Sequence, residues 1–164
     1  MLGFSRSKCM KNIQIIKHHR GALGLRLFGL GPKMKPMKGL IQLKKLLDDH
    51  TFWAKGRSMK RLKMMLSKST VVITVWRENN LIGFGRANSD YIFRSVLWDI
   101  VVANENQGEG IGSLLIETLI NAPEIKDVEK IYLMTTHCSN FYKNKGFQFN
   151  SNQKLLYINR ISEI

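Results

Sequence analysis

The feature that most constrains this chain is a glycine-rich hexapeptide, Gln107-Gly108-Glu109-Gly110-Ile111-Gly112. It follows a hydrophobic run over 95–103 that is typical of a buried strand, and it precedes an apolar stripe of helical period over 114–122. Glycine permits positive φ and lacks the Cβ atom that would block an approaching phosphate. At a helix start, free backbone N–H groups converge and the helix dipole favours negative charge. The stretch therefore predicts a turn that binds a pyrophosphate-bearing ligand, the alternative being a tight turn that needs glycine only for its shape.

The surroundings of the hexapeptide disfavour two common pyrophosphate ligands. A P-loop for ATP requires a Lys directly after its glycines, and none follows here. A dinucleotide-binding fingerprint requires glycine where this chain has Ser113, and an acidic residue at the end of the next strand, where it has Thr135 and Thr136. ATP and NAD are both disfavoured as ligands.

The remaining patterns predict a mixed α/β fold. A strand is expected on either side of the helix that follows the hexapeptide, which makes a right-handed βαβ crossover with two parallel strands. The other strands are joined by short turns and are expected to be antiparallel. We expect helices over 40–47, 58–66 (capped by Ser58), 114–122 and 140–145 (ended by Gly146), and strands over 71–76, 81–87, 95–103, 131–135 and 155–158.

Charge is distributed unevenly along the 164 residues. The formal net charge is +14, and residues 1–68 hold 17 of the 26 Lys and Arg but 2 of the 12 acidic residues. Residues 1–38 contain no acidic residue and are interpreted as a basic N-terminal extension, with residues 39–164 as the domain. The extension is expected to be a loosely packed tail, a targeting segment or an arm that contacts nucleic acid.

The cysteines and the hydrophobic runs narrow the class of protein further. Cys9 and Cys138 make no disulfide framework, and no spacing suggests a metal site. The longest clean apolar run, Val71–Trp76, is far too short to span a membrane. We expect a protein with no metal and no membrane anchor, in the cytoplasm, or in the plastid stroma if the extension is a targeting segment.

Two motifs carry a resemblance to a known family. Gln107-x-x-Gly110-x-Gly112 resembles the Q/R-x-x-G-x-G/A signature of the GCN5-related N-acetyltransferase (GNAT) superfamily. About thirty residues later, 140–147 resembles the family's late F-Y-x-x-x-G-F element. The resemblance covers roughly residues 40–158, and 81–90 with Trp98-Asp99 looks most like the cyanobacterial and plastid branch.

The resemblance implies a GNAT-like fold with a mostly antiparallel central sheet, and an enzyme that transfers acetyl from acetyl-CoA to a primary amine. In the family, the amine attacks directly in a ternary complex. The loop amides of residues 107–112 would hold the CoA pyrophosphate. The open backbone of the preceding strand, at Ile100, Val101 and Val102, would pair with pantetheine, and one of its amides would polarise the thioester carbonyl.

Two residues of the late element have roles implied by the same resemblance. Tyr142 matches the tyrosine that donates a proton to the departing thiolate; the alternative is a tyrosine that only packs against Phe141 and Phe147. Asn140 would contact the cofactor through its side chain, or would cap the short helix.

The acceptor side is less defined by the sequence. Asp99 and Glu105 are candidate bases, although the role of a structural or solvated carboxylate is favoured for each of them. His137 and Cys138 would supply a nucleophile only if transfer were indirect, which the family does not need. Thr135 stands where many relatives carry Asn or Asp, and His18 and His19 are expected to be solvated.

The acceptor itself stays open, as a small-molecule or protein amine. The basic first half disfavours polyamines, because like charges repel in the encounter, and suits an anionic partner better. A non-catalytic CoA-binding or nucleic-acid-associated module is the alternative function. A homodimer is one of the oligomeric states that the sequence allows.

Overall fold

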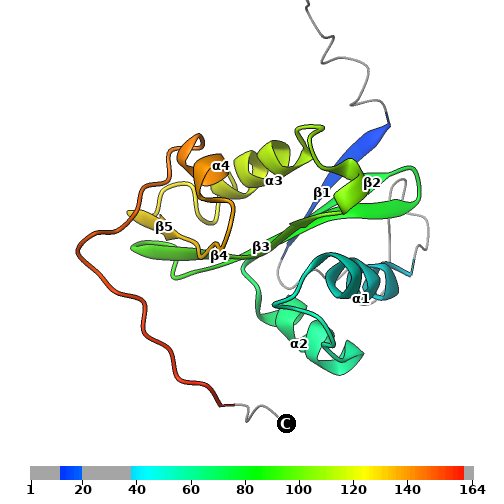
Figure 1. The fold of residues 1–164 in the computed structure, drawn as a ribbon, viewed down its shortest axis with the longest axis horizontal. Coiled ribbons are helices and arrows are strands. Elements are labelled where there is room, and N and C mark those ends of the chain that lie inside the picture. The colour runs from blue at the N-terminus through cyan, green and yellow to red at the C-terminus, as the bar shows by residue number, and fades with distance from the viewer. Residues whose placement is uncertain (1–11, 20–37, 161–164) are drawn as a thin grey trace, which may run out of the picture. The chain divides into compact units, whose positions relative to one another are not determined.

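A computed structural model describes residues 12–19 and 38–160 of the chain. The chain falls into two units, residues 1–134 and residues 135–164, which are described separately. The first unit holds a five-stranded sheet with the order β1-β2-β3-β4-β5 (Figure 1). Its strands are β1 (Ile13–His19), β2 (Val71–Arg77), β3 (Asn80–Ser89), β4 (Arg94–Val102) and β5 (Lys130–Tyr132).

The predicted mixed sheet is confirmed. Neighbouring strands from β1 to β4 pair antiparallel, whereas β4 and β5 pair parallel. The connection from β4 to β5 runs through a 3-10 turn, η3 (Asn104–Asn106), and then through α3 (Ile111–Ile120). This unit is the predicted βαβ crossover. Helices α1 (Gly39–His50) and α2 (Met59–Lys68) cover one face of the sheet, and α3 covers the other (Figure 1).

The face under α1 and α2 is packed with leucine. Leu43, Leu47, Leu62 and Leu66 are almost completely buried, against Trp76 and other large side chains of the sheet. Helix α2 begins where the sequence predicts, because the Ser58 hydroxyl accepts a hydrogen bond from the Arg61 N–H (3.3 Å). The two helices therefore owe their positions to the apolar stripe that the sequence shows.

The opposite face fixes α3 through a glycine in β3. A Cβ atom at Gly85 would lie 2.8 Å from the Ile100 side chain and 3.0 Å from those of Leu115 and Leu119. A side chain at this position would force these three side chains to move. Gly85 thereby allows α3, and the turn that precedes it, to lie close against β3 and β4.

Strand β1 corrects our expectation of a loosely packed tail, at least for residues 13–19. These residues pair with the whole length of β2, and His18 is buried with its Nε2 2.9 Å from the Thr74 hydroxyl oxygen. The expectation that His18 is solvated is therefore wrong. Isoleucines at 13, 15 and 16 favour a strand more strongly than the surrounding Lys and His favour solvent. The domain boundary at residue 39 stays a prediction.

The second unit contains one short helix, α4 (Ser139–Lys143), among its described residues. The helix ends as predicted at Gly146, which has a φ of +90°, and the Phe147 N–H donates to the Tyr142 carbonyl. The last predicted strand is not observed, since 155–158 carries no strand and its side chains are exposed. A strand needs a hydrogen-bonded partner, and the described part of this unit supplies none.

Candidate functional site

The parallel strands β4 and β5 pair only at their beginnings. Arg94, Ser95 and Val96 of β4 face β5, and the rest of β4, from Leu97 to Val102, has no β5 partner. On its other side β4 stays paired with β3 up to Val102. The strand that leads into the glycine-rich turn therefore has one open backbone edge, and Ile100, Val101 and Val102 all lie on this stretch.

A β-bulge interrupts β4 in the middle of that open stretch. Phe84 and Arg86 of β3 pair with Val101 and Trp98, so that two β4 residues, Asp99 and Ile100, oppose the single Gly85. Asp99 takes a left-handed φ of +52°, which is uncommon for a residue with a side chain. The bulge turns the Ile100 side chain toward α3, while the neighbouring Val101 joins the core under α1.

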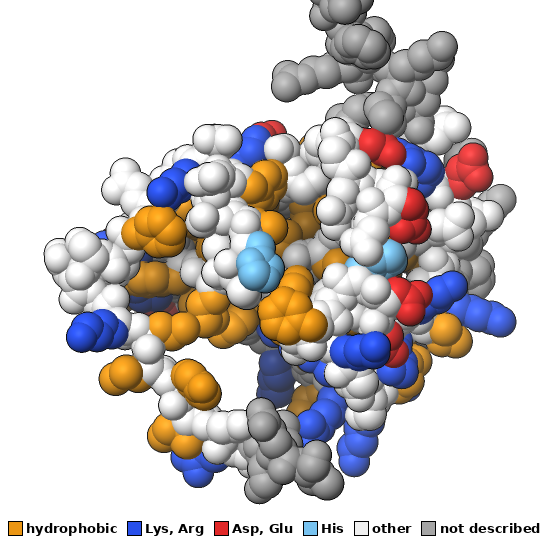
Figure 2. Space-filling view, viewed as in Figure 1, with side chains coloured by type: hydrophobic (Ala, Val, Ile, Leu, Met, Phe, Trp, Pro, Cys, Tyr) orange, Lys and Arg blue, Asp and Glu red, His pale blue; other side chains and the backbone are white. Residues whose placement is uncertain are grey.

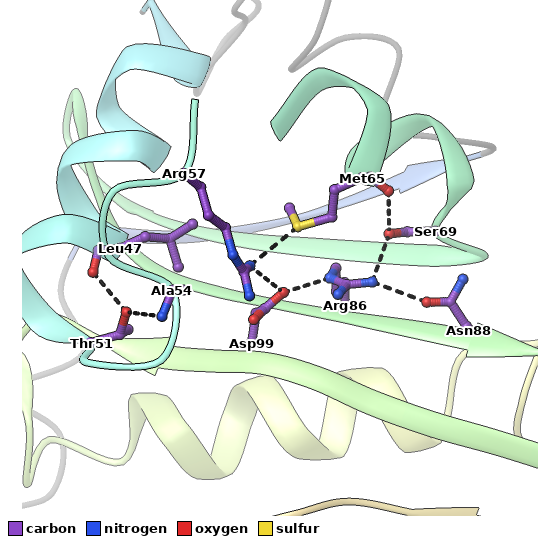
Figure 3. A network of polar contacts seen from close by, with 9 residues as sticks. All are labelled: Leu47, Thr51, Ala54, Arg57, Met65, Ser69, Arg86, Asn88 and Asp99. Atoms are coloured by element: carbon purple, nitrogen blue, oxygen red, sulfur yellow. Dashed lines mark hydrogen bonds and ion pairs between the residues drawn. The ribbon is translucent and has the colours of Figure 1, made fainter. Parts of the chain in front are cut away.

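The Asp99 carboxylate is held in a network of polar contacts (Figure 3). Its Oδ2 lies 3.0 Å from Nη1 of Arg57 and 2.7 Å from Nε of Arg86, and the side chain is only 3% exposed. Arg86 also donates to Asn88 (3.0 Å) and contacts the Ser69 hydroxyl (3.5 Å). Asp99 therefore fixes the bulge and the loop before α2. Because two arginines bond its carboxylate, that carboxylate is not free to act as a base.

The glycine-rich turn has the conformation that its sequence predicts. Gly108 and Gly110 have φ values of +80° and +86°, and a Cβ atom at either position would point into open space. Gly110 is the N-cap of α3 and offers no side chain to the first turn. Among the described residues, the backbone N–H groups of Ile111, Gly112 and Ser113 have no hydrogen-bond acceptor. The turn thus presents donor groups to an open space at the positive end of a helix.

Gln107 anchors the start of this turn. Its side-chain amide donates to the Val102 carbonyl (3.2 Å) and to the Asn104 side chain (3.1 Å). These two contacts tie the turn to the end of β4, so that the open strand edge and the turn form one continuous surface. The sequence predicts that the turn follows this strand, but it does not predict the contacts of the Gln107 side chain.

Glu109 forms an ion pair that the sequence did not indicate. Its carboxylate bonds the guanidinium of Arg77, at the end of β2, and both side chains are mostly buried. A free carboxylate in this turn would repel an anionic ligand, and the arginine compensates its charge. Arg77 is thus a site residue that sequence reasoning missed, because 32 residues separate the partners.

A pocket of about 650 Å³ lies beside η3 on the α1 side of the sheet. Glu105, the second candidate base, lines it with a 70% exposed side chain, and its Oε2 is 3.9 Å from Nε2 of His50. His50 accepts a hydrogen bond at Nδ1 from the Asn104 N–H (3.3 Å). Glu105 is a solvated carboxylate, and His50 belongs to the same pocket, although no motif pointed to it.

In the second unit, Tyr142 lies between two phenylalanines. Its ring centroid is 5.0 Å from that of Phe141 and 5.9 Å from that of Phe147, both in edge-to-face arrangements. Burial of the phenol, with a smaller contribution from negative charge at Cys138, raises the pKa of Tyr142 to about 12. The phenol therefore keeps its proton at neutral and mildly alkaline pH.

The other candidates of the second unit are exposed. One of the two roles expected for Asn140 was to cap α4. This expectation is wrong, because Cys138 is the N-cap and Asn140 lies within the helix. The Cys138 N–H donates to the hydroxyl of Thr135 (3.1 Å), and the thiol of Cys138 is free. His137 is exposed.

The described residues contain neither a metal-binding cluster nor a membrane-spanning helix. No three His, Cys, Asp or Glu side chains gather in a way that could hold a metal ion. No helix in residues 12–19 and 38–160 is long and apolar enough to cross a membrane.

The comparisons with known proteins define the class of this protein. The model of the acetyltransferase (GNAT) domain matches residues 68–149, which contain the open edge of β4, the glycine-rich turn and Tyr142. The chain belongs to the GCN5-related N-acetyltransferase family. The recognition made from the two motifs is therefore confirmed.

The chain is similar to proteins of plastid and cyanobacterial lineages. It is 35% identical over 113 residues to the uncharacterized N-acetyltransferase ycf52 of Gracilaria tenuistipitata, covering 66% of this chain and 61% of the relative. It is 40% identical over 73 residues to the chloroplastic GCN5-related N-acetyltransferase 2 of Arabidopsis thaliana, covering 44% and 28%. The matched region thus spans less than two thirds of these relatives.

Solved structures show the same fold. An acetyltransferase of the GNAT family from Streptococcus pneumoniae superposes with a TM-score of 0.66 at 21% identity, over 91% of this chain and 99% of that one. An aminoglycoside acetyltransferase from a soil metagenomic sample gives 0.64 at 15% identity, over 95% and 100%. At these identities the likeness concerns the fold alone.

Proposed function

We propose that this protein transfers an acetyl group from acetyl-CoA to a primary amine by direct attack. The observation that carries the proposal is the open edge of β4, which runs into a turn whose N–H groups have no acceptor among the described residues. Together they offer a row of backbone groups to an extended amide-containing chain, followed by a donor cluster for its diphosphate. Pantetheine and the CoA pyrophosphate have this order.

The residues of the turn fit a diphosphate on two counts. The space that a Cβ atom would enter at Gly108 and Gly110 is open, so phosphate oxygens can approach the main chain. The first-turn amides of α3 add the positive end of a helix. The Arg77–Glu109 ion pair removes the repulsion that Glu109 alone would exert.

Acetyl-CoA supplies an activated thioester. The new bond joins the amine nitrogen to the carbonyl carbon, the C–S bond breaks, and the proton of the attacking amine leaves to solvent. In our proposal a β4 amide near the bulge, among Ile100, Val101 and Val102, stabilises the negative charge that develops on the carbonyl oxygen. Tyr142 donates to the departing sulfur, and Asn140 contacts the cofactor.

The raised pKa of Tyr142 defines how it acts. A phenol with a pKa of about 12 stays protonated, so the donor is present at every physiological pH. Complete transfer of its proton to a thiolate, whose ordinary pKa is about 8.5, is uphill. Tyr142 therefore stabilises the sulfur by hydrogen bonding while the proton balance is completed by solvent.

We assign no side chain as the base. Asp99 is occupied by two arginines, and Glu105 is exposed and lies in the pocket beside η3. In this proposal, the acceptor must arrive as the free amine or lose its proton to water. Activity should then rise with pH up to the pKa of the acceptor amine.

The test combines binding and turnover. Isothermal titration should show acetyl-CoA binding, and mass spectrometry of a panel of amines and peptides incubated with the protein and acetyl-CoA should show a gain of one acetyl group. Binding without transfer to any amine would favour the non-catalytic module. Absence of binding would refute both the site and the activity.

The cellular location remains a proposal, with the cytoplasm and the plastid stroma as the two options. The plastid alternative gains support from the Arabidopsis relative, whose name places that protein in the chloroplast. Expression of residues 1–38 fused to a fluorescent protein in plant cells tests whether this basic segment directs import.

A further inference from the structure

The exposed face of α2 is uniformly positive. The helix buries Leu62 and Leu66 and turns four cations to solvent, Lys60, Arg61, Lys63 and Lys68. The surrounding stretch, residues 51–77, holds seven Lys or Arg and no Asp or Glu. Figure 2 shows Lys and Arg side chains gathered in the lower part of the view, where Figure 1 places α2. We call these four residues the α2 basic face.

Several other cations of the first unit form ion pairs with carboxylates. Lys17 pairs with Glu124, Lys44 with Asp48, and Arg94 with Glu129. None of the ion pairs recorded among the described residues involves a member of the α2 basic face. Helix α2 thus carries four exposed cations that form no recorded ion pair with the described residues, in a stretch of sequence without a carboxylate.

This arrangement works against the stability of the helix. The first turn contains Lys60 and Arg61 and no acidic residue, whereas the positive end of a helix dipole favours negative charge. Lys60 and Lys63 are three residues apart on one face, where like charges repel. A local arrangement that opposes folding and has no compensating contact points to a partner that supplies the missing charge.

Both ends of α2 are tied to the bulge of β4. Arg57, two residues before the helix begins, bonds Asp99 (3.0 Å) and contacts the sulfur of Met65 (3.5 Å). At the other end, Arg86 connects Asp99 to Ser69, the C-cap of α2 (Figure 3). A helix of ten residues is about 15 Å long, a length that an extended peptide of about five residues spans.

We propose that the α2 basic face binds an acidic segment of a polypeptide whose primary amine is the acceptor, which rests on the proposed acetyl transfer beside the bulge. The carboxylates of such a segment would supply the charge that the helix lacks. A nucleic acid offers the same charge but only exocyclic base amines, whose lone pairs are delocalised and poorly nucleophilic. Free polyamines carry the wrong charge for this surface.

Two peptides of equal length test the proposal with the full chain and acetyl-CoA. Each presents one primary amine next to six residues that are either Asp and Glu or Asn and Gln. The wild type should acetylate the acidic peptide with a KM at least tenfold lower and a similar kcat at 50 mM salt. Raising the salt to 500 mM should remove most of this preference.

Charge-neutralising variants locate the effect. Lys60→Gln/Lys63→Gln should raise the KM for the acidic peptide at least tenfold and should leave the affinity for acetyl-CoA within twofold. Lys126→Gln/Lys130→Gln removes the same charge from exposed positions after α3 and is the matched control. The control should keep the preference for the acidic peptide.

The outcomes separate the two proposals. Equal transfer to both peptides would overturn the docking role of α2 and leave acetyl transfer intact. If neither peptide and no amine in the panel is acetylated, the proposed acetyl transfer and the acceptor assigned to α2 are both overturned. Tenfold tighter binding of a single-stranded RNA of equal charge, with displacement of the acidic peptide, would overturn the polypeptide as partner.

Discussion

At the scale of single residues, substitution of Gly110 tests whether the glycine is needed for ligand contact or only to avoid backbone strain. Its left-handed φ means that Gly110→Ala costs about 1 kcal/mol of unfolding free energy, and the new methyl group enters the open space in front of α3. We expect the affinity for acetyl-CoA to fall at least tenfold. Titration calorimetry measures the affinity, and urea denaturation measures the stability.

Gly56 provides the control for that variant. It also has a left-handed φ, of +78°, and open space around a new Cβ atom, but it lies in the loop between α1 and α2. Gly56→Ala should lose the same stability and bind acetyl-CoA like the wild type. An equal loss of affinity in both variants would mean that strain, rather than phosphate contact, explains the first result.

Tyr142 can be examined by its ionisation and by its effect on turnover. In an ultraviolet titration, one tyrosine should ionise near pH 12, and Tyr142→Phe should remove this late transition. Since the folded-state pKa is raised, the stability linked to this group is complete below about pH 10 and is lost between pH 10 and 12. The variant should lower kcat about a hundredfold, with acetyl-CoA affinity within twofold.

The kcat and the acetyl-CoA affinity of Tyr142→Phe together test the role of Tyr142 as hydrogen-bond donor to the departing sulfur. A Tyr142→Phe protein with unchanged kcat would make the tyrosine a packing residue for Phe141 and Phe147. A fall in affinity for acetyl-CoA as large as the fall in kcat would instead indicate a disturbed binding site.

At the scale of elements, the bulge of β4 depends on one carboxylate. Asp99→Asn keeps a side chain that tolerates the left-handed φ but leaves Arg57 and Arg86 without their anion. We expect the free energy of unfolding to fall by about 3 kcal/mol in urea denaturation. Asp127→Asn, which removes an exposed partner of Lys126, should cost less than about 0.5 kcal/mol.

The same variant tests whether Asp99 acts as a base. Where Asp99→Asn is still folded, the pH profile of kcat should keep its shape, because the carboxylate is structural. A profile that loses its acidic limb would reassign Asp99 to catalysis.

The sequence predicted the elements better than the contacts between them. The βαβ unit, the Ser58 cap and the turn at Gly146 follow from local chemistry, namely apolar period, a hydroxyl before a helix and a residue that adopts positive φ. The Arg77–Glu109 pair and the two arginines on Asp99 join residues far apart in the chain, and no local pattern specifies them. Strand β1 was not predicted, because the basic charge of residues 1–38 favoured a loosely packed tail over the strand that three isoleucines indicate.

At the scale of the whole molecule, β1 attaches the N-terminal segment to the sheet. Thr74 is buried, and its hydroxyl lies 2.9 Å from Nε2 of His18 and accepts from the Trp76 indole N–H (2.8 Å). In a double-mutant cycle, His18→Ala and Thr74→Val should be coupled by about 1 kcal/mol in thermal or urea denaturation. Strictly additive effects would show that β1 is not docked in solution.

The asymmetry of charge also acts at this scale. Both the CoA diphosphate and the acidic acceptor proposed for α2 are anionic, and the chain carries a net charge of +14. Long-range attraction of this kind raises association rates and is screened by salt. A homodimer stays a prediction, and light scattering can test it.

If acetyl-CoA binds along the open edge of β4, as we propose, the stability of the folded chain depends on the supply of that thioester. A ligand present at a hundred times its dissociation constant adds about 2.7 kcal/mol to the free energy of unfolding. A chain starved of acetyl-CoA would unfold more often and be degraded sooner. The cell would then hold less of this protein when acetyl groups are scarce, without any dedicated sensor.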